Sequence, residues 1–551
     1  MGTNNDKKIT ILLSILLALV AVLILILCVF KPKFEGTINT GTNVENISSG
    51  NANDEVDNVE NKDENNNEIV NNNQYSDFDF KFLKLENQKK NKIYSPLSIK
   101  YALKMLEDAS EGETKKQITD LLGNIKLTKY KSSENLSLAN SFFIRDTFKS
   151  NIKETYINML KDKYDAEINY DTFENATNIN DWIKNKTLGI IPQILSDDEV
   201  KELDFSLVNA LAIDMEWKER FLQAGQRAIF PHEKADSIYL DIEWGEMDLS
   251  QNTFKSGDKE FEVSGMRVNA TINNYDIIKE LGKENIEKIV REEYTKFAKN
   301  EDYDEEHVWG DFPLSEDVSD AGIQKDLNEF MPNYITGLSE NYHKVGFTTD
   351  FSIYVDDNVK VFAKDLKEYD GTTLQYVGIM PVSTELDKFI EEIDKVTVDN
   401  YISSLKGIKH EEFKEGVVTK IRGYIPKFKF NYELDLKTNL ERVNVIDVFD
   451  IKKANISNMI ETEASISGVK HKADIEFTQD GIKAAAATVV GGGGGGEPFD
   501  YKFDVPVEVI DITFDKPYMF LIRDKETDET WFVGTVYEPL LWADDTTSGN
   551  W

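Results

Sequence analysis

The 551-residue chain is poor in cysteine and in positive charge. Its only cysteine is Cys28, so no intramolecular disulfide can stabilise the fold. Lys and Arg number 63 against 100 Asp and Glu, which gives a formal net charge of -37. Because binding to nucleic acid needs clustered Lys and Arg, this charge argues against a nucleic-acid partner. Hydrophobic residues, at 40%, are sufficient for a sizeable core.

Sequence motifs for catalysis and metal binding are also lacking. None of the five histidines lies in an H-E-x-x-H pattern, and no G-x-S-x-G elbow or phosphate-binding glycine loop is present. The acidic run 301–306 lacks the turn glycine and the twelfth-position ligand of an EF-hand, so it is interpreted as a solvated face. We therefore predict no enzyme activity, no metal and no cofactor.

The N-terminus contains one long apolar segment. Residues 9–30 carry no charge and are long enough to cross a bilayer as a helix. Lys7 and Lys8 precede this segment, which predicts a cytoplasmic tip and a transmembrane signal-anchor over 1–31 with the rest of the chain outside the cell. Two alternatives remain. One is a cleaved signal peptide, although no small-x-small site follows; the other is a lipid anchor at Cys28, although Leu25-Ile26-Leu27 lacks the usual small residue.

The residues after the apolar segment change character twice. Residues 32–77 are rich in Asn, Asp and Glu and have little apolar surface to bury, so we expect a disordered tether. Residues 78–540 form the predicted folded domain, and 541–551 form a C-terminal tail. Asn- and Lys-rich composition together with the predicted anchor suggests a bacterial surface protein.

Helical and strand periodicities begin soon after the tether. Ile99, Leu103 and Leu106 recur at helical spacing directly after Ser95 and Pro96, which supply cap chemistry. Similar patterns predict further helices over 118–122, 152–164 and 179–189. The nearly unbroken apolar run 205–213 predicts a strand buried on both faces. Asn209 lies in the middle of this run, either in a hydrogen-bond network or as an ordinary strand residue.

Several motifs then follow one another in the order found in a known family. They are Tyr94-Ser95-Pro96-Leu97-Ser98-Ile99, Asn180-x-Trp182, Leu207-Val208-Asn209-Ala210, Trp217-Lys218-x-x-Phe221, Pro426-Lys427-Phe428-Lys429-Phe430 and Tyr518-Met519-Phe520-Leu521. In this order the chain from Phe78 to Pro539 resembles the serpin family of serine protease inhibitors. The resemblance implies an α+β fold with a central β-sheet A, two further sheets and about nine helices.

The resemblance also implies roles for particular residues. Ser95, Ser98, Asn209 and His471 match a hydrogen-bonded gate under the central sheet, and Trp217 matches a tryptophan at its top. Two stretches, about 222–251 and 274–350, do not match the family and are interpreted as insertions. The second carries apolar residues at helical spacing, so we expect helices there, packed on the surface.

The implied activity is suicide inhibition of a serine or cysteine protease through a covalent acyl complex, by a monomeric protein. A reactive loop over about 479–510 serves as bait, and its first half inserts into the central sheet after cleavage. The residues that match an inhibitory hinge are Gly481, Ile482, Ala484, Ala485, Ala486, Ala487 and Thr488. Ile482 and Lys483 are larger or differently charged than is usual there. The competing hypothesis is a non-inhibitory serpin-fold surface or binding protein whose loop is merely cleaved.

The position of the scissile bond depends on the direction of counting. Family spacing from Gln479 places it at Gly495-Gly496, which suits a protease that accepts small residues. The segment from Gly496 to Pro517 is about ten residues longer than that spacing. Counting back from Pro517 moves the bond to Tyr501 or Lys502, which suit chymotrypsin-like and trypsin-like proteases. The six glycines from 491 to 496 offer no side chains to pack, so we expect them to weaken insertion.

Overall fold

The computed structural model describes residues 77–221, 252–310, 313–467, 469–482 and 499–544. The predicted membrane segment 9–30, the predicted tether, the first insertion and residues 483–498 of the reactive loop lie outside these ranges. In the described ranges no helix is both long and apolar enough to cross a bilayer. Contacts divide the chain into Met1–Ile69 and Val70–Trp551, and all of the described residues belong to the second unit.

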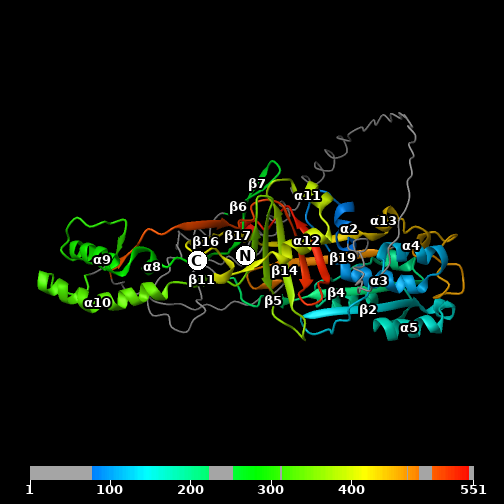
Figure 1. Cartoon of the computed structure of the whole chain (residues 1–551). Helices are drawn as coiled ribbons and strands as arrows, with labels where there is room; N and C mark the ends of the chain where they lie inside the picture. The colour runs from blue at the N-terminus through cyan, green and yellow to red at the C-terminus, as the bar shows by residue number, and fades with distance from the viewer. Residues whose placement is uncertain (1–76, 222–251, 311–312, 468, 483–498, 545–551) are drawn as a thin grey trace, which may run out of the picture. The chain divides into compact units, whose positions relative to one another are not determined.

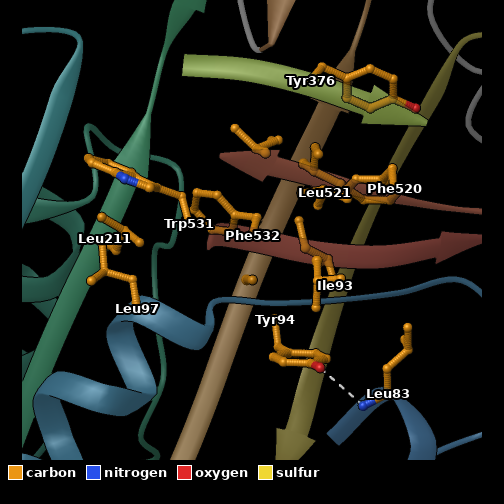
Figure 2. Packing of buried hydrophobic residues seen from close by; sticks show 14 of the residues in the cluster. Leu83, Ile93, Tyr94, Leu97, Leu211, Tyr376, Phe520, Leu521, Trp531 and Phe532 are labelled. Carbon is orange, nitrogen blue, oxygen red and sulfur yellow. Dashed lines mark hydrogen bonds between the residues drawn. The ribbon is translucent and has the colours of Figure 1, made fainter. Parts of the chain in front are cut away.

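A seven-stranded antiparallel sheet lies at the centre of the largest hydrophobic core. Its strand order is β1-β24-β23-β14-β13-β12-β15. The strands are β1 (Lys92–Tyr94), β12 (Ser352–Val355), β13 (Val359–Asp365), β14 (Leu374–Pro381), β15 (Lys406–Gly407), β23 (Tyr518–Asp524) and β24 (Thr530–Val536). β14, β23 and β24 are buried along their whole length, because apolar side chains cover both faces. Figure 2 shows Ile93, Leu521 and Phe532 of this sheet clustered with Leu97 and Leu211.

Nine α-helices lie outside the second insertion in the described part of the chain. They are α2 (Phe78–Leu85), α3 (Pro96–Ala109), α4 (Gly112–Leu122), α5 (Glu154–Tyr164), α6 (Thr177–Lys186), α7 (Asp197–Lys201), α11 (Leu386–Glu392), α12 (Lys395–Ser403) and α13 (Leu436–Arg442). α3 begins where the sequence predicts, because Ser95 Oγ accepts the Ser98 N–H and Pro96 occupies the first turn. The predicted helices over 118–122, 152–164 and 179–189 are confirmed as α4, α5 and α6, with shifts at their ends.

The predicted central sheet is present as two hydrogen-bonded groups of strands. One has the order β3-β2-β4, and the other has the order β18-β19-β20-β5. Their bounds are β2 (Leu136–Arg145), β3 (Glu167–Asp171), β4 (Phe205–Ile213), β5 (Met215–Glu216), β18 (Phe428–Asp435), β19 (Lys470–Phe477) and β20 (Gly481–Ile482). β4 confirms the predicted strand 205–213, but its first half is not buried on both faces as predicted, because Phe205, Ser206, Leu207 and Asn209 are only partly buried. Because β5 follows β4 after a single residue, β20 links the two groups through β5.

A third sheet carries the chain that leaves the reactive loop. Its order is β11-β9-β16-β22, with β11 (Val345–Phe347), β9 (Ala270–Asn273), β16 (Val418–Arg422) and β22 (Val507–Asp511). β22 runs parallel to β16, whereas the other two pairs are antiparallel. Two smaller antiparallel pairs complete this region: β17 (Tyr424–Pro426) with β8 (Gly265–Arg267), and β6 (Asn252–Ser256) with β7 (Lys259–Val263).

The second insertion emerges between β9 and β11 and forms a core of its own. It contains α8 (Ile277–Leu281), α9 (Lys283–Ala298), β10 (Val308–Trp309) and α10 (Asp320–Glu340). α9 and α10 pack against each other (Figure 1), and Ile286, Tyr294 and Leu327 are buried between them. The acidic residues of 301–306 are exposed to solvent. A short strand after the reactive loop, β21 (Asp500–Tyr501), pairs with β10.

Candidate functional site

The candidate site is an open slot between β4 and β19. An upper cavity of about 360 Å³ has β4 residues 211–213 on one side and β19 residues 473–476 on the other. A lower cavity of about 550 Å³ continues between β4 residues 205–209 and His471, above α3. We call these two cavities together the slot. Across the described strands, β4 and β19 belong to different sheets, so the slot separates the two groups of strands.

β20 closes the upper end of the slot. Ile482 pairs with Phe477 of β19 on one side and with Met215 of β5 on the other, and both pairings are antiparallel. The Ile482 side chain is only 2% exposed and lines the upper cavity. The predicted hinge therefore begins inside the sheet, where Ile482 is paired on both edges and Gly481 is paired with Glu216 of β5.

Gly481 is required by the close approach of β5. A Cβ atom built on Gly481 would lie 2.3 Å from the carbonyl oxygen of Met215 and 2.8 Å from the Cα of Glu216. Both neighbours are backbone atoms, which cannot rotate away as a side chain can. No residue with a side chain fits here without moving the strands apart.

The turn between β19 and β20 is fastened to the tryptophan that the sequence places at the top of the central sheet. Trp217 is fully buried; its backbone N–H donates to Asp480 O at 3.1 Å and its indole N–H donates to Thr478 O at 2.9 Å. The Phe221 N–H donates to Gln479 O at 3.1 Å. Each carbonyl of the turn 478–480 thus accepts a hydrogen bond from Trp217 or Phe221. These bonds fix the position of the turn directly before the hinge.

Lys364 lies behind this tryptophan, and its role could not be predicted from the sequence. Its Nζ lies 4.9 Å from the centroid of the Phe221 ring and donates to Thr349 Oγ1 at 2.5 Å and Asp350 O at 2.6 Å. Burial lowers the pKa of Lys364 to about 8. The strand sequence Val-Lys-Val-Phe-Ala-Lys-Asp contains two lysines and gives no signal that Lys364 is buried.

His471 and the start of α3 meet at the lower cavity. His471 Nε2 accepts the backbone N–H of Ser95 at 2.9 Å, and Ser95 Oγ accepts the N–H of Ser98 at 3.0 Å. Burial lowers the pKa of His471 to about 4. The imidazole is therefore neutral at physiological pH, in agreement with its role as a hydrogen-bond acceptor.

Asn209 contributes to the same cavity but bonds to a different partner. Its Nδ2 donates to Asn140 Oδ1 at 2.8 Å, and Asn140 in turn donates to Tyr164 O at 2.8 Å. In the described part of the chain, Asn209 Oδ1 is buried and has no hydrogen-bond partner. Of the four predicted gate residues, Ser95, Ser98 and His471 are thus joined to one another, and Asn209 lines the same cavity without bonding to them. Asn140 was missed, and an amide within the apolar run of β2 is its only sequence signal.

Only one of the two predicted scissile bonds can be placed. Gly495 and Gly496, like the hinge residues Ala484 to Thr488, lie outside the described residues. Tyr501 lies in β21, where its carbonyl accepts the Tyr334 hydroxyl at 3.0 Å, and the Lys502 N–H donates to His307 O at 2.8 Å. A protease needs a free extended chain, so these internal pairings disfavour Tyr501-Lys502 and favour a bond upstream. The alternation of Phe499, Tyr501 and Phe503 is a strand signal that could have predicted this pairing.

Comparison with known families agrees with this architecture. The model of the family described as Serpin (serine protease inhibitor) matches residues 71–242 and 348–539. This chain belongs to the serpin family. The interval without a match, 243–347, contains α8, α9 and α10.

Individual serpins resemble the chain over most of its length. Glia-derived nexin of Mus musculus is 22% identical over 472 residues, which cover 82% of this chain and 88% of the relative. Neuroserpin of Mus musculus is also 22% identical, with 82% and 86% covered. Among solved structures, the thermophilic serpin tengpin in its native state superposes with a TM-score of 0.54 at 20% identity, covering 87% of this chain and 96% of tengpin. The serpin fold of this chain is therefore shown.

We predict that Gly481→Ala destabilises the pairing of β20 with β5. The added Cβ meets the backbone of Met215 and Glu216, so the free energy of unfolding should fall by about 1–3 kcal/mol. Urea unfolding of wild type and variant measures this change. Gly371→Ala is a control with no atom near the added Cβ, although its positive φ makes a small loss expected there as well. An unchanged stability of Gly481→Ala would contradict the geometry.

We also predict that His471 makes the fold sensitive to acid. Its pKa of about 4 in the folded protein is below the ordinary value of about 6.5, so the unfolded chain takes up this proton first as the pH falls. The stabilisation is complete above pH 6.5, is lost between about pH 6.5 and 4, and amounts to about 3 kcal/mol. Urea unfolding across this range should show a smaller loss for His471→Gln than for wild type. His410→Gln should behave like wild type, and equal pH profiles for His471→Gln and wild type would refute the prediction.

Proposed function

We propose that this serpin inhibits serine-type endopeptidases by offering residues 479–510 as bait and inserting the freed strand into the slot. The observation that carries the proposal is β20, which already occupies the upper end of the slot in register with both neighbouring strands. A chain that continues beyond Ile482 has two edges available to pair with. Strand addition of this kind gains backbone hydrogen bonds and buried side chains.

The existing register predicts where each further residue would pair. Ile482 is opposite Phe477 and Met215, so each step along the loop moves one residue back along β19 and along β5 and β4. Continued without a bulge, this register places Lys483 opposite Glu476 and Thr488 opposite both His471 and Asn209. Residues that face each other across antiparallel strands share one side of the sheet. Thr488 would then bring a hydroxyl donor to the unpartnered Oδ1 of Asn209.

The two faces of the inserted strand suit their surroundings. Ala484, Ala486 and Thr488 would lie on the side where Ile475, Ala473 and His471 are buried, and such small side chains fit a slot without displacing its walls. On the other side, Lys483 would lie opposite Glu476, an arrangement that pairs opposite charges. The unusual lysine in the hinge is thus compatible with insertion.

The glycine run affects insertion less than the sequence suggested. β19 begins at Lys470, and the same register places Lys470 opposite Val489. Residues 491–496 would therefore lie beyond the first residue of β19. Nearly all of the new pairing with β19 would involve residues that carry side chains.

The chemistry of the trap follows the ordinary course of proteolysis up to the acyl-enzyme. The protease serine Oγ adds to the scissile carbonyl carbon, the C–N bond breaks, and the amine on the C-terminal side leaves with a proton. The ester then travels with the inserting strand to the lower end of the slot before water can hydrolyse it. A cysteine protease would form a thioester in the same way.

The sequence further supports a class of target protease and a cellular location for the serpin domain. A bond at Gly495-Gly496 presents no side chain to the protease, so elastase-like or subtilisin-like enzymes that accept small residues are the proposed targets. Residues 9–30 are proposed to hold the serpin domain outside a bacterial cell membrane.

The test is to incubate the purified full-length protein with elastase, subtilisin, chymotrypsin and trypsin, one at a time. A covalent complex that survives denaturing electrophoresis is expected with at least one of the first two. Mass spectrometry of the released C-terminal fragment identifies the bond that is cut. Cleavage without a complex, and without a rise in Tm of the cleaved protein, would instead identify a non-inhibitory serpin.

We predict that a charge on the buried side of the inserting strand converts the inhibitor into a substrate. In Ala486→Lys the ammonium would be buried opposite Ala473, at a cost of several kcal/mol. The control Ala485→Lys carries the same charge one residue away, opposite the half-buried Asp474. The measurement is the fraction of cleaved inhibitor found in the covalent complex, which should fall at least about tenfold for Ala486→Lys only. Equal losses in the two variants would show that the predicted register is wrong.

A further inference from the structure

The segment that follows the reactive loop completes the core of the second insertion. Phe499 is 2% exposed, and its ring lies 5.1 Å from Tyr294, 5.5 Å from Phe297 and 6.4 Å from Phe330, measured between ring centroids. These three partners come from α9 and α10. The Phe499 ring therefore fills the interior of a helical unit more than 150 residues earlier in the chain.

Backbone pairing extends this attachment along residues 499–505, which we call the arm. Tyr501 pairs with Val308, and Asp500 pairs with Trp309, in the β10–β21 ribbon. The Tyr334 hydroxyl and the His307 carbonyl add the two hydrogen bonds already described. Phe503 and Val505 pack partly buried against the same core as Phe499. The arm and the insertion thus form one folded unit, which accounts for the additional length between the glycine run and Pro517.

We propose that Phe499 is a positioning residue: it fastens the C-terminal end of the bait to the insertion, so that the uncleaved loop cannot fill the slot. Cleavage upstream of Phe499 frees the N-terminal part and leaves the arm in place. The insertion would thus make strand insertion depend on cleavage. This inference rests on the proposed inhibitory function.

The reach of the chain supports the proposal. Residues 483–498 link Ile482 to Phe499 and span at most about 60 Å when fully extended. Each inserted residue moves the chain about 3.3 Å further along the slot, away from Ile482. The residues that are not inserted must then span the distance back to Phe499. An uncleaved loop can therefore insert at most about eight residues, even if Phe499 lay directly beside Ile482.

The length of the slot exceeds this limit. In the same register, pairing down to Phe205 at the start of β4 needs Lys483 to Gly492, which is ten residues. The attachment of Phe499 to the core of the insertion therefore keeps the uncleaved loop from filling the slot. If the arm is released as far as Val507, the first residue of β22, the limit rises to about twelve residues.

The experiment follows the intact full-length protein during incubation just below its unfolding temperature. Conversion here means insertion of the loop into the slot without cleavage. It is measured as the appearance of an uncleaved form with a raised Tm and no inhibitory activity. Phe499→Ala should convert at least about tenfold faster than wild type, because the arm loses its buried ring. The conservative Phe499→Leu should stay within about threefold of wild type.

Two further variants separate this role from a general loss of stability. Phe80→Ala removes an equally buried ring from α2 and should lower stability without producing the heat-stable uncleaved form. A Gly-Ser linker of about ten residues between Pro498 and Phe499 leaves every contact of the arm intact and should speed conversion, because it lengthens the tether. This linker variant also provides a test if Phe499→Ala does not fold.

The outcomes distinguish the two proposals. If wild type shows a rise in Tm after loop cleavage but neither Phe499→Ala nor the linker variant converts faster, the positioning role is overturned. If cleaved wild type shows no rise in Tm, the proposed inhibitory function fails first. Faster conversion of both variants with a normal rise in Tm after cleavage supports the role of Phe499.

Discussion

The structure depends on a two-residue strand held between two longer ones. Gly481 and Ile482 form the strand pairing that joins the two groups of central strands, because β20 pairs with β19 and with β5. Two features fix this link: the missing side chain of Gly481, which lets the backbones approach, and the burial of Ile482. Trp217 and Phe221 hold the preceding turn from above. The slot, the hinge register and the attachment of the loop all follow from this arrangement.

The remainder of the slot is maintained without strand pairing. Cavities of about 360 and 550 Å³ lie between β4 and β19, and Asn209 Oδ1 has no hydrogen-bond partner in the described part of the chain. Apolar surface left uncovered between the strands and an unpartnered buried oxygen both raise the free energy of the folded state. His471 and Ser95 partly offset this cost, because they form a buried hydrogen bond at the lower cavity. A folded state that contains such unmade interactions can release free energy when a strand enters.

Local patterns predicted the features that depend on local chemistry. The helix cap at Ser95, the four helices α3 to α6 and the buried strand β4 followed from capping residues and periodicity. The resemblance to serpins supplied the fold and the hinge. The direct bond between Ser95 and His471 fits the expected gate, whereas the bond from Asn209 to Asn140 was not anticipated.

Features that depend on distant pairing were not predictable from one sequence. Phe499 packs against Tyr294 and Phe297, and nothing in either segment indicates the other. Buried Lys364 donates hydrogen bonds to Thr349 and Asp350, which lie in another part of the sequence. A count along the loop could not reveal that residues after the glycine run belong to another core. That count therefore left Tyr501 and Lys502 as candidates for the scissile bond.

The shared core of the arm and the insertion has a consequence for how this chain relates to shorter serpins. The helices α9 and α10 would leave a hole without Phe499, and the arm would expose Phe499, Tyr501 and Phe503 without the helices. Each piece therefore covers apolar surface of the other. The two extra segments, far apart in sequence, must therefore be gained, lost or transplanted as a pair, and an alignment that treats them as independent loops would misrepresent one structural unit.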